Sequence, residues 1–261
     1  MRARALAAAL AAGLLAGPLA GCGSADPTPS AQAGSAGVTG DLTVFAAASL
    51  TEAFGTIGRQ FEAAHPGTHV TFSFGASSDL ATQITQGAPA DVFASAAPAP
   101  MEKVTGAGEA SGPQTFASNE LEIAVLPGNP AHVGSLADLA RPGVKLALCA
   151  EQVPCGAAAV KLLTAVGVTA HPVTLEKDVK AALSKVQLGE VDAALVYRTD
   201  VKAAAGKVDG VQIPEAGKAV NRYPIVALAH ARNAAAARAF VEYVLSADGQ
   251  RVLADAGFAS P

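Results

Sequence analysis

The chain has 261 residues, of which 51% are hydrophobic and 15% charged, and its formal net charge is −4 at pH 7. This composition supports a substantial core, and the length fits one large α/β unit or two lobes. No basic cluster or alternation of aromatic and basic residues is found, which argues against nucleic acid as a partner. Any bound anion must therefore be held by local groups rather than by a positive overall field.

The N-terminal segment is typical of an exported protein. Arg2 and Arg4 precede an apolar run over residues 5–20, which is shorter than the ~20 residues of a membrane-spanning helix. We therefore predict a signal peptide over residues 1–21. Removing it leaves 16 basic against 22 acidic residues, a net charge of −6.

The end of this segment, Leu19-Ala20-Gly21-Cys22, resembles the bacterial lipobox, in which the cysteine is lipidated and becomes the first mature residue. An incidental cysteine behind an ordinary signal peptide is the alternative. Residues 22–40 are rich in Gly, Ser, Pro, Thr and Ala, with Asp26 their one charge, which predicts a flexible tether. The expected location is the outer face of the cytoplasmic membrane, with the lipid as the only membrane contact.

From residue 41 onward, apolar strand patterns alternate with helical ones. Strands are predicted over residues 42–48, 69–74, 91–94, 120–125, 144–148, near 173, and over 193–197, 211–213 and 223–229. Helices are predicted from residues 49 and 77, over 98–104, 156–166 and 178–188, and twice near the C-terminus. This alternation predicts parallel sheets with helices on both faces.

Two further cysteines, Cys149 and Cys155, lie close together in the sequence. In an oxidising compartment such a pair indicates a disulfide that closes a small loop. Two independent buried thiols are the alternative, and a redox pair is disfavoured because the spacing is not Cys-x-x-Cys.

Three predicted strand-to-helix junctions carry a small or hydroxyl residue where the helix begins: Ser49, Ser77 and Cys155 with Gly156. Helix N-termini present unpaired N–H groups and the positive end of the helix dipole, so they bind anions readily. In open α/β sheets, ligands bind at the carboxyl ends of the strands, where these junctions lie. Each serine taken singly also fits an ordinary helix N-cap.

Six sequence blocks, in order, resemble the periplasmic molybdate-binding proteins of molybdate ABC transporters. They are TVFAAASLT (43–51), FGASSDLATQI (74–84), GAPADVFASA (87–96), VPCG (153–156), DVKAAL (178–183) and LVY (195–197). The resemblance covers essentially the whole chain from residue 41. It implies a two-lobed, type II periplasmic-binding-protein fold of the α/β class, with parallel-rich sheets flanked by helices and the ligand in the cleft between lobes. Residues 41–119 and 222–261 would form lobe 1, and residues 120–221 lobe 2.

The resemblance also implies a ligand set for an oxyanion. The hydroxyls of Ser49, Ser77 and Tyr197 would contact it, together with main-chain N–H groups near Ser49, Ser77, Cys155 and Val179. These residues would bind the oxygens of molybdate or tungstate rather than a bare metal ion. The implied partner is an ABC permease, and we expect a monomer with no resident cofactor. Tyr197 also fits a core tyrosine at a strand end.

The implied chemistry is consistent, because a fully deprotonated oxyanion accepts hydrogen bonds only and such a site donates them. Sulfate on the same fold remains an alternative, since only pocket size separates it from molybdate. Phosphate is a second alternative, in which Asp79 accepts the ligand proton. The preferred role of Asp79 is to complement the dipole of its helix.

Other functional classes have weaker signals. Ser77 does not lie in Gly-x-Ser-x-Gly, there is no phosphate-binding Gly-x-x-x-x-Gly-Lys loop, and the five histidines lack metal-site spacing. We therefore do not expect an enzyme. A two-lobed transferase is the enzyme alternative and would need a reactive cysteine or an arginine-lined cleft. A surface adhesion or signalling lipoprotein would keep the anchor without the oxyanion site.

Overall fold

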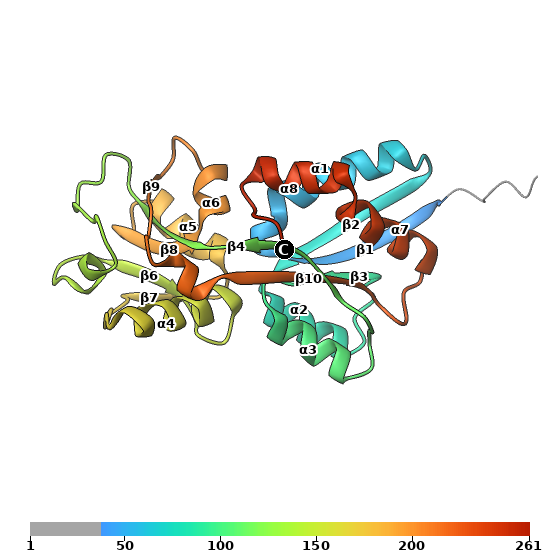
Figure 1. The fold of residues 1–261 in the computed structure, drawn as a ribbon, viewed down its shortest axis with the longest axis horizontal. Helices are drawn as coiled ribbons and strands as arrows, with labels where there is room; N and C mark the ends of the chain where they lie inside the picture. The colour runs from blue at the N-terminus through green and yellow to red at the C-terminus, as the bar shows by residue number, and fades with distance from the viewer. Residues whose placement is uncertain (1–37) are drawn as a thin grey trace, which may run out of the picture. The chain divides into compact units, whose positions relative to one another are not determined.

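The computed structural model describes residues 38–261, which form two lobes, each built on a five-stranded sheet (Figure 1). The first sheet has the order β2-β1-β3-β10-β4. Its strands are β1 (Gly40–Ala47), β2 (Thr68–Gly75), β3 (Val92–Ala94), β4 (Gln114–Asn119) and β10 (Asn221–Ala227). Its helices are η1 (Ala48–Leu50), α1 (Thr51–Ala64), α2 (Ser77–Thr85), α3 (Pro98–Gly106), α7 (Ala234–Leu245) and α8 (Ala247–Ala256).

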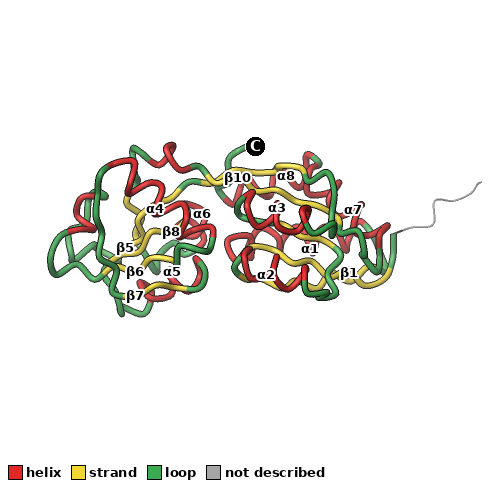
Figure 2. Tube along the Cα trace, turned by 90° about the horizontal axis from the view of Figure 1, so that it is seen from below, coloured by secondary structure: helices red, strands yellow, loops and turns green. Residues whose placement is uncertain are grey.

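The second sheet has the order β7-β6-β8-β5-β9. Its strands are β5 (Leu121–Val125), β6 (Leu146–Cys149), β7 (Thr174–Glu176), β8 (Ala193–Tyr197) and β9 (Asp209–Val211). Its helices are α4 (Pro154–Val166), α5 (Val179–Gln187) and α6 (Arg198–Ala203), with short 3-10 turns η2 (Ala137–Ala140) and η3 (Ala216–Ala219). The chain passes from the first sheet to the second between β4 and β5, and it returns at the start of β10. β10 lies at this crossing in both views (Figures 1 and 2).

The predicted α/β class and two-lobed architecture are confirmed, but both sheets are mixed. β1 pairs in parallel with β2 and β3, and β6 pairs in parallel with β7 and β8. β10 runs antiparallel to β3 and β4, and β5 runs antiparallel to β8 and β9. The antiparallel strands are those that connect the two sheets, so they do not follow the β-α-β alternation from which parallel pairing was predicted.

The first sheet separates two apolar cores because its side chains alternate between faces. On β1, Leu42, Val44 and Ala46 pack with α1, α7 and α8, where Phe54, Phe61 and Phe240 meet edge to face. Phe45 points to the other face, toward α2 and α3. The second lobe has one large aliphatic core on both faces of its sheet. These cores fix the strand ends from which the candidate site is built.

The predicted signal peptide, the lipidation site Cys22 and almost all of the predicted tether lie outside the described residues. Within residues 38–261, no helix is both long and apolar enough to cross a bilayer. The same residues contain no group of three or more His, Cys, Asp or Glu side chains placed to hold a metal ion.

Candidate oxyanion site

All five residues predicted as oxyanion ligands line one small cavity between the two lobes. Its volume is about 20 Å³, little more than the ~10–15 Å³ that a single water needs by the same measure. A hollow this small suits an ion of a few heavy atoms rather than a sugar or a peptide. The lining residues are Ala47, Ala48, Ser49, Gly75, Ala76, Ser77, Ala96, Val153, Pro154, Cys155, Asp178, Val179 and Tyr197.

Two neighbouring strands bring the serines together in the first lobe. β1 and β2 are parallel, and their last residues, Ala47 and Gly75, are paired in register. Ser49 and Ser77 each follow two residues later, inside the first turn of η1 and at the start of α2. Both serines are at least 95% buried. The common strand edge predicted from the sequence is therefore the edge that carries both hydroxyls.

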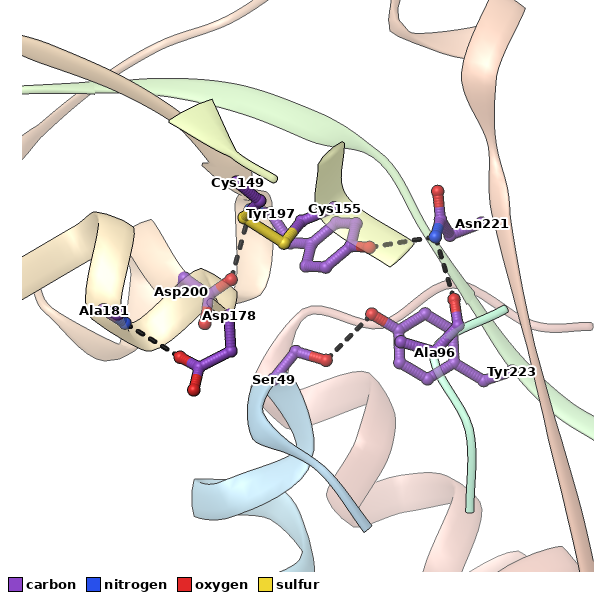
Figure 3. The surroundings of a disulfide bond; sticks show 10 residues. All are labelled: Ser49, Ala96, Cys149, Cys155, Asp178, Ala181, Tyr197, Asp200, Asn221 and Tyr223. Carbon is purple, nitrogen blue, oxygen red and sulfur yellow. Dashed lines mark hydrogen bonds between the residues drawn. A yellow bond between two sulfur atoms is a disulfide. The ribbon is translucent and has the colours of Figure 1, made fainter. Parts of the chain in front are cut away.

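The second lobe contributes one strand end and two helix starts to the cavity lining. Cys155 lies in the first turn of α4, Val179 is the first residue of α5, and Tyr197 is the last residue of β8. Cys155 forms a disulfide with Cys149 at the end of β6, with the two Cα atoms 5.7 Å apart (Figure 3). The predicted disulfide is thus present, and it ties the loop before α4 to the sheet.

Four helix N-termini meet at the cavity, two from each lobe: those of η1 with α1, α2, α4 and α5. The first N–H groups of a helix have no partner within the helix, and the helix dipole adds partial positive charge there. The lining contains no Lys, Arg or His. Its one carboxylate, Asp178, caps α5 by accepting a 2.9 Å hydrogen bond from Ala181 N–H. The cavity is therefore suited to an anion through dipoles rather than basic side chains.

Each of the three hydroxyls also forms a hydrogen bond with another group of the protein. Ser49 Oγ lies 3.0 Å from Tyr223 Oη, and Tyr197 Oη lies 2.9 Å from Asn221 Nδ2 (Figure 3). Ser77 Oγ lies 2.9 Å from Ala96 N. Burial raises the pKa of Tyr197 and that of Tyr223 well above the usual value, so both phenols keep their protons. The Tyr197 hydroxyl, like the two serine hydroxyls, therefore carries a proton that can be donated.

Comparison with known proteins agrees with this geometry. Residues 42–259 match the profile of a family described as bacterial extracellular solute-binding protein. The chain belongs to this solute-binding family. It is 46% identical to the molybdate-binding protein ModA of Mycobacterium tuberculosis over 241 residues, 92% of each chain. It is 34% identical to the molybdate-binding protein ModA of Escherichia coli, over 84% of this chain and 89% of the relative.

This solute-binding protein also resembles solved structures of other proteins. The periplasmic molybdate-binding protein of Azotobacter vinelandii superposes with a TM-score of 0.73 at 25% identity, covering 84% of this chain and 99% of that one. The sulfate-binding protein SubI of Mycobacterium tuberculosis has the same TM-score of 0.73 at 21% identity, covering 84% of this chain and 86% of that one. The second likeness concerns the fold alone.

One charged cluster of the solute-binding protein was not predicted. Lys180 Nζ on α5 lies 2.8 Å from Glu52 Oε2 on α1, and so joins the two lobes. It also lies 3.1 Å from Asp200 Oδ1 on α6, as an ion pair rather than an aligned hydrogen bond. Burial opposes the charge on Lys180, but Asp200 and Glu52 together outweigh it and raise its pKa. Asp200 also accepts a 3.1 Å hydrogen bond from Tyr197 N–H at the cavity wall.

Asp200 gives a pH-dependent stability. It is fully buried, and burial raises its pKa from 3.8 to about 6 against the attraction of Lys180. Because the folded pKa exceeds the unfolded one, the folded state binds more protons between the two values and gains stability as the pH falls through 6. From pH 7 to pH 5, we expect wild type to gain about 1 kcal/mol relative to Asp200→Asn. Urea unfolding of both proteins at both pH values measures this, and a relative loss by wild type would contradict it.

Asp79 lies in the first turn of α2, but it is exposed and is not part of the cavity lining. This position suits the dipole role and leaves the carboxylate without the placement needed to accept a proton from bound phosphate.

Proposed function

We propose that this protein captures molybdate outside the cytoplasm and delivers it to an ABC importer, with tungstate as a second ligand. The observation that carries the proposal is the small cavity between the lobes, where four helix N-termini meet and which all five predicted residues line. The 46% identity to mycobacterial proteins named as molybdate-binding supports the choice of ligand. Ser49, Ser77 and Tyr197 would donate from hydroxyls, and the peptides of Cys155 and Val179 would donate from N–H groups.

The energetics support such a ligand. Burying a dianion is costly unless its hydrogen bonds are complete. Each hydrogen bond to a charged partner contributes about 1.5–3 kcal/mol net, so five donors offset a large desolvation penalty. The two lobes, residues 41–119 with 222–261 and residues 120–221, would close over the ion by hinge bending. The Glu52–Lys180 ion pair would form part of the closed contact.

The alternatives gain less support. Sulfate fits the same donors, but the sulfate-binding neighbour shares only the fold. A transferase would need a reactive thiol or arginines in the cleft, whereas Cys155 is in a disulfide and the lining has no arginine.

The rest of the proposal concerns delivery. The mature chain would begin at a lipidated Cys22 and remain on the outer face of the cytoplasmic membrane as a monomer. Residues 22–40 would then let the binding domain reach an ABC permease.

Thermal unfolding of residues 38–261 with molybdate, tungstate, sulfate and phosphate added in turn tests the ligand. A ligand at about 1,000 times its dissociation constant adds ~4 kcal/mol of stability. In a domain of this size, that raises the midpoint by on the order of 10 °C. We expect this shift with molybdate and tungstate only. A shift with sulfate or phosphate alone would make that anion the ligand in place of molybdate. No shift with any of the four anions would refute the candidate site.

A further inference from the structure

The three cavity hydroxyls contact other polar groups of the protein, and several of these groups can act only as donors or only as acceptors. A hydroxyl has one proton to donate, and its oxygen can also accept. If the oxygen already accepts from a fixed donor, its own proton is left for a partner on the other side. Groups that can act in only one way, such as a backbone N–H or a carbonyl oxygen, restrict the direction of these hydrogen bonds.

Ser77 is the simplest case. Ala96 N lies 2.9 Å from Ser77 Oγ, and a backbone N–H can only donate. Ser77 Oγ therefore accepts, and its own proton is free to point into the cavity that Ser77 lines.

Tyr197 depends on the orientation of the Asn221 amide. Asn221 Nδ2 lies 2.8 Å from Ala96 O and 2.9 Å from Tyr197 Oη. A carbonyl oxygen can only accept, so the NH₂ group must face Ala96, and the same group then donates to Tyr197. The Tyr197 proton is not used in this bond and remains for another partner, and Tyr197 lines the cavity.

For Ser49, the direction of the hydrogen bond depends on Asn119 and Tyr223. Asn119 Oδ1 accepts from Glu120 N–H at 3.0 Å, which turns the Asn119 NH₂ group toward Thr199 Oγ1 at 2.9 Å and Tyr223 Oη at 3.5 Å. Tyr223 Oη thus accepts from Asn119, so its own proton is available to Ser49 Oγ, 3.0 Å away, in a contact where either hydroxyl can be the donor. With Tyr223 as the donor, Ser49 keeps its own proton for the cavity that it lines.

We infer that Asn221 and Tyr223 are positioning residues that hold Tyr197 and Ser49 as donors toward the cavity, as the Ala96 peptide holds Ser77. The inference rests on the proposed function and sharpens it. The three hydroxyls then favour an oxyanion without a proton, such as molybdate, over hydrogen phosphate, whose O–H finds no hydroxyl acceptor among them. Neither Asn221 nor Tyr223 lines the cavity, so both act through the residues in front of them.

Calorimetric titration of the Tyr223→Phe protein tests this. Without the Tyr223 proton, Ser49 can rotate and accept as well as donate. We expect molybdate to bind about tenfold more weakly, while the preference for molybdate over phosphate, measured by competition at pH 7, narrows by about tenfold. Asn221→Leu should narrow the preference in the same way through Tyr197. The matched control is Tyr243→Phe, which removes a hydroxyl bonded to Gln60 on α1, outside the cavity, and should change neither quantity.

If the two variants lost affinity for molybdate and for phosphate by the same factor, the role of both residues would be merely structural and the inference would be overturned. Unchanged affinity for molybdate would also overturn it. Failure of the wild-type protein to bind molybdate would instead count against the proposed function, so the two failures are distinguishable.

Discussion

Replacing Gly156 with alanine is expected to lower the free energy of unfolding by about 1–3 kcal/mol, or more, and to weaken ligand binding. A Cβ atom at this position would lie 1.9 Å from Ala150 O and 2.7 Å from Cys149 O. Both contacts are with backbone in the loop that the Cys149–Cys155 disulfide closes, so no side chain can rotate away. The loop must shift, and it leads into Cys155, which lines the cavity.

Urea unfolding and molybdate titration of Gly156→Ala measure the two effects. Gly55→Ala is the control, because a Cβ there would meet only the Arg59 side chain at 3.8 Å within helix α1. Alanine is a better helix former than glycine, so this variant should be as stable as wild type or slightly more stable. Equal unfolding midpoints for wild type and Gly156→Ala would show that the loop accommodates the methyl group.

The Ser49→Ala, Ser77→Ala double variant is expected to bind molybdate about 10²- to 10⁴-fold more weakly than wild type. Each substitution removes one hydrogen bond to a charged ligand, and two such bonds are worth ~3–6 kcal/mol. Isothermal titration calorimetry measures the loss. Ser78→Ala is the matched control, since Ser78 adjoins Ser77 but is not part of the cavity lining. An affinity of the double variant close to that of wild type would remove both serines from the ligand set.

Much of the arrangement of residues at the candidate site was predictable because it depends on local patterns. An apolar run followed by a serine predicts a strand that ends where a helix begins, and this holds at Ser49 and Ser77. The parallel pairing of β1 and β2 then brings the two serines to one edge, as the strand-edge rule predicts. The short spacing of Cys149 and Cys155 likewise favoured the disulfide that the structure contains.

The remaining features depend on contacts between distant segments. β4 has the sequence QTFASN and α6 has six residues, so neither offers enough apolar periodicity to be recognised. Tyr223 is 174 residues from Ser49, and Lys180 is 128 residues from Glu52. No local pattern distinguishes Tyr223 from other strand tyrosines or Lys180 from other helix lysines. Asn119 and Asn221 are paired in register where β4 and β10 leave the first sheet. The sequence placed the passage between the two lobes near these residues, but it did not predict their hydrogen bonds.

The absence of basic side chains from the described cavity lining also bears on the kinetics of capture. The chain carries a net charge of −4, so its long-range field does not steer a dianion toward the cleft. Helix N-termini act on an ion only within about one turn, so attraction begins at contact. Added salt would screen repulsion rather than attraction, and encounter should quicken with ionic strength. Tight retention in such a protein must come from a long residence time after closure rather than from fast arrival.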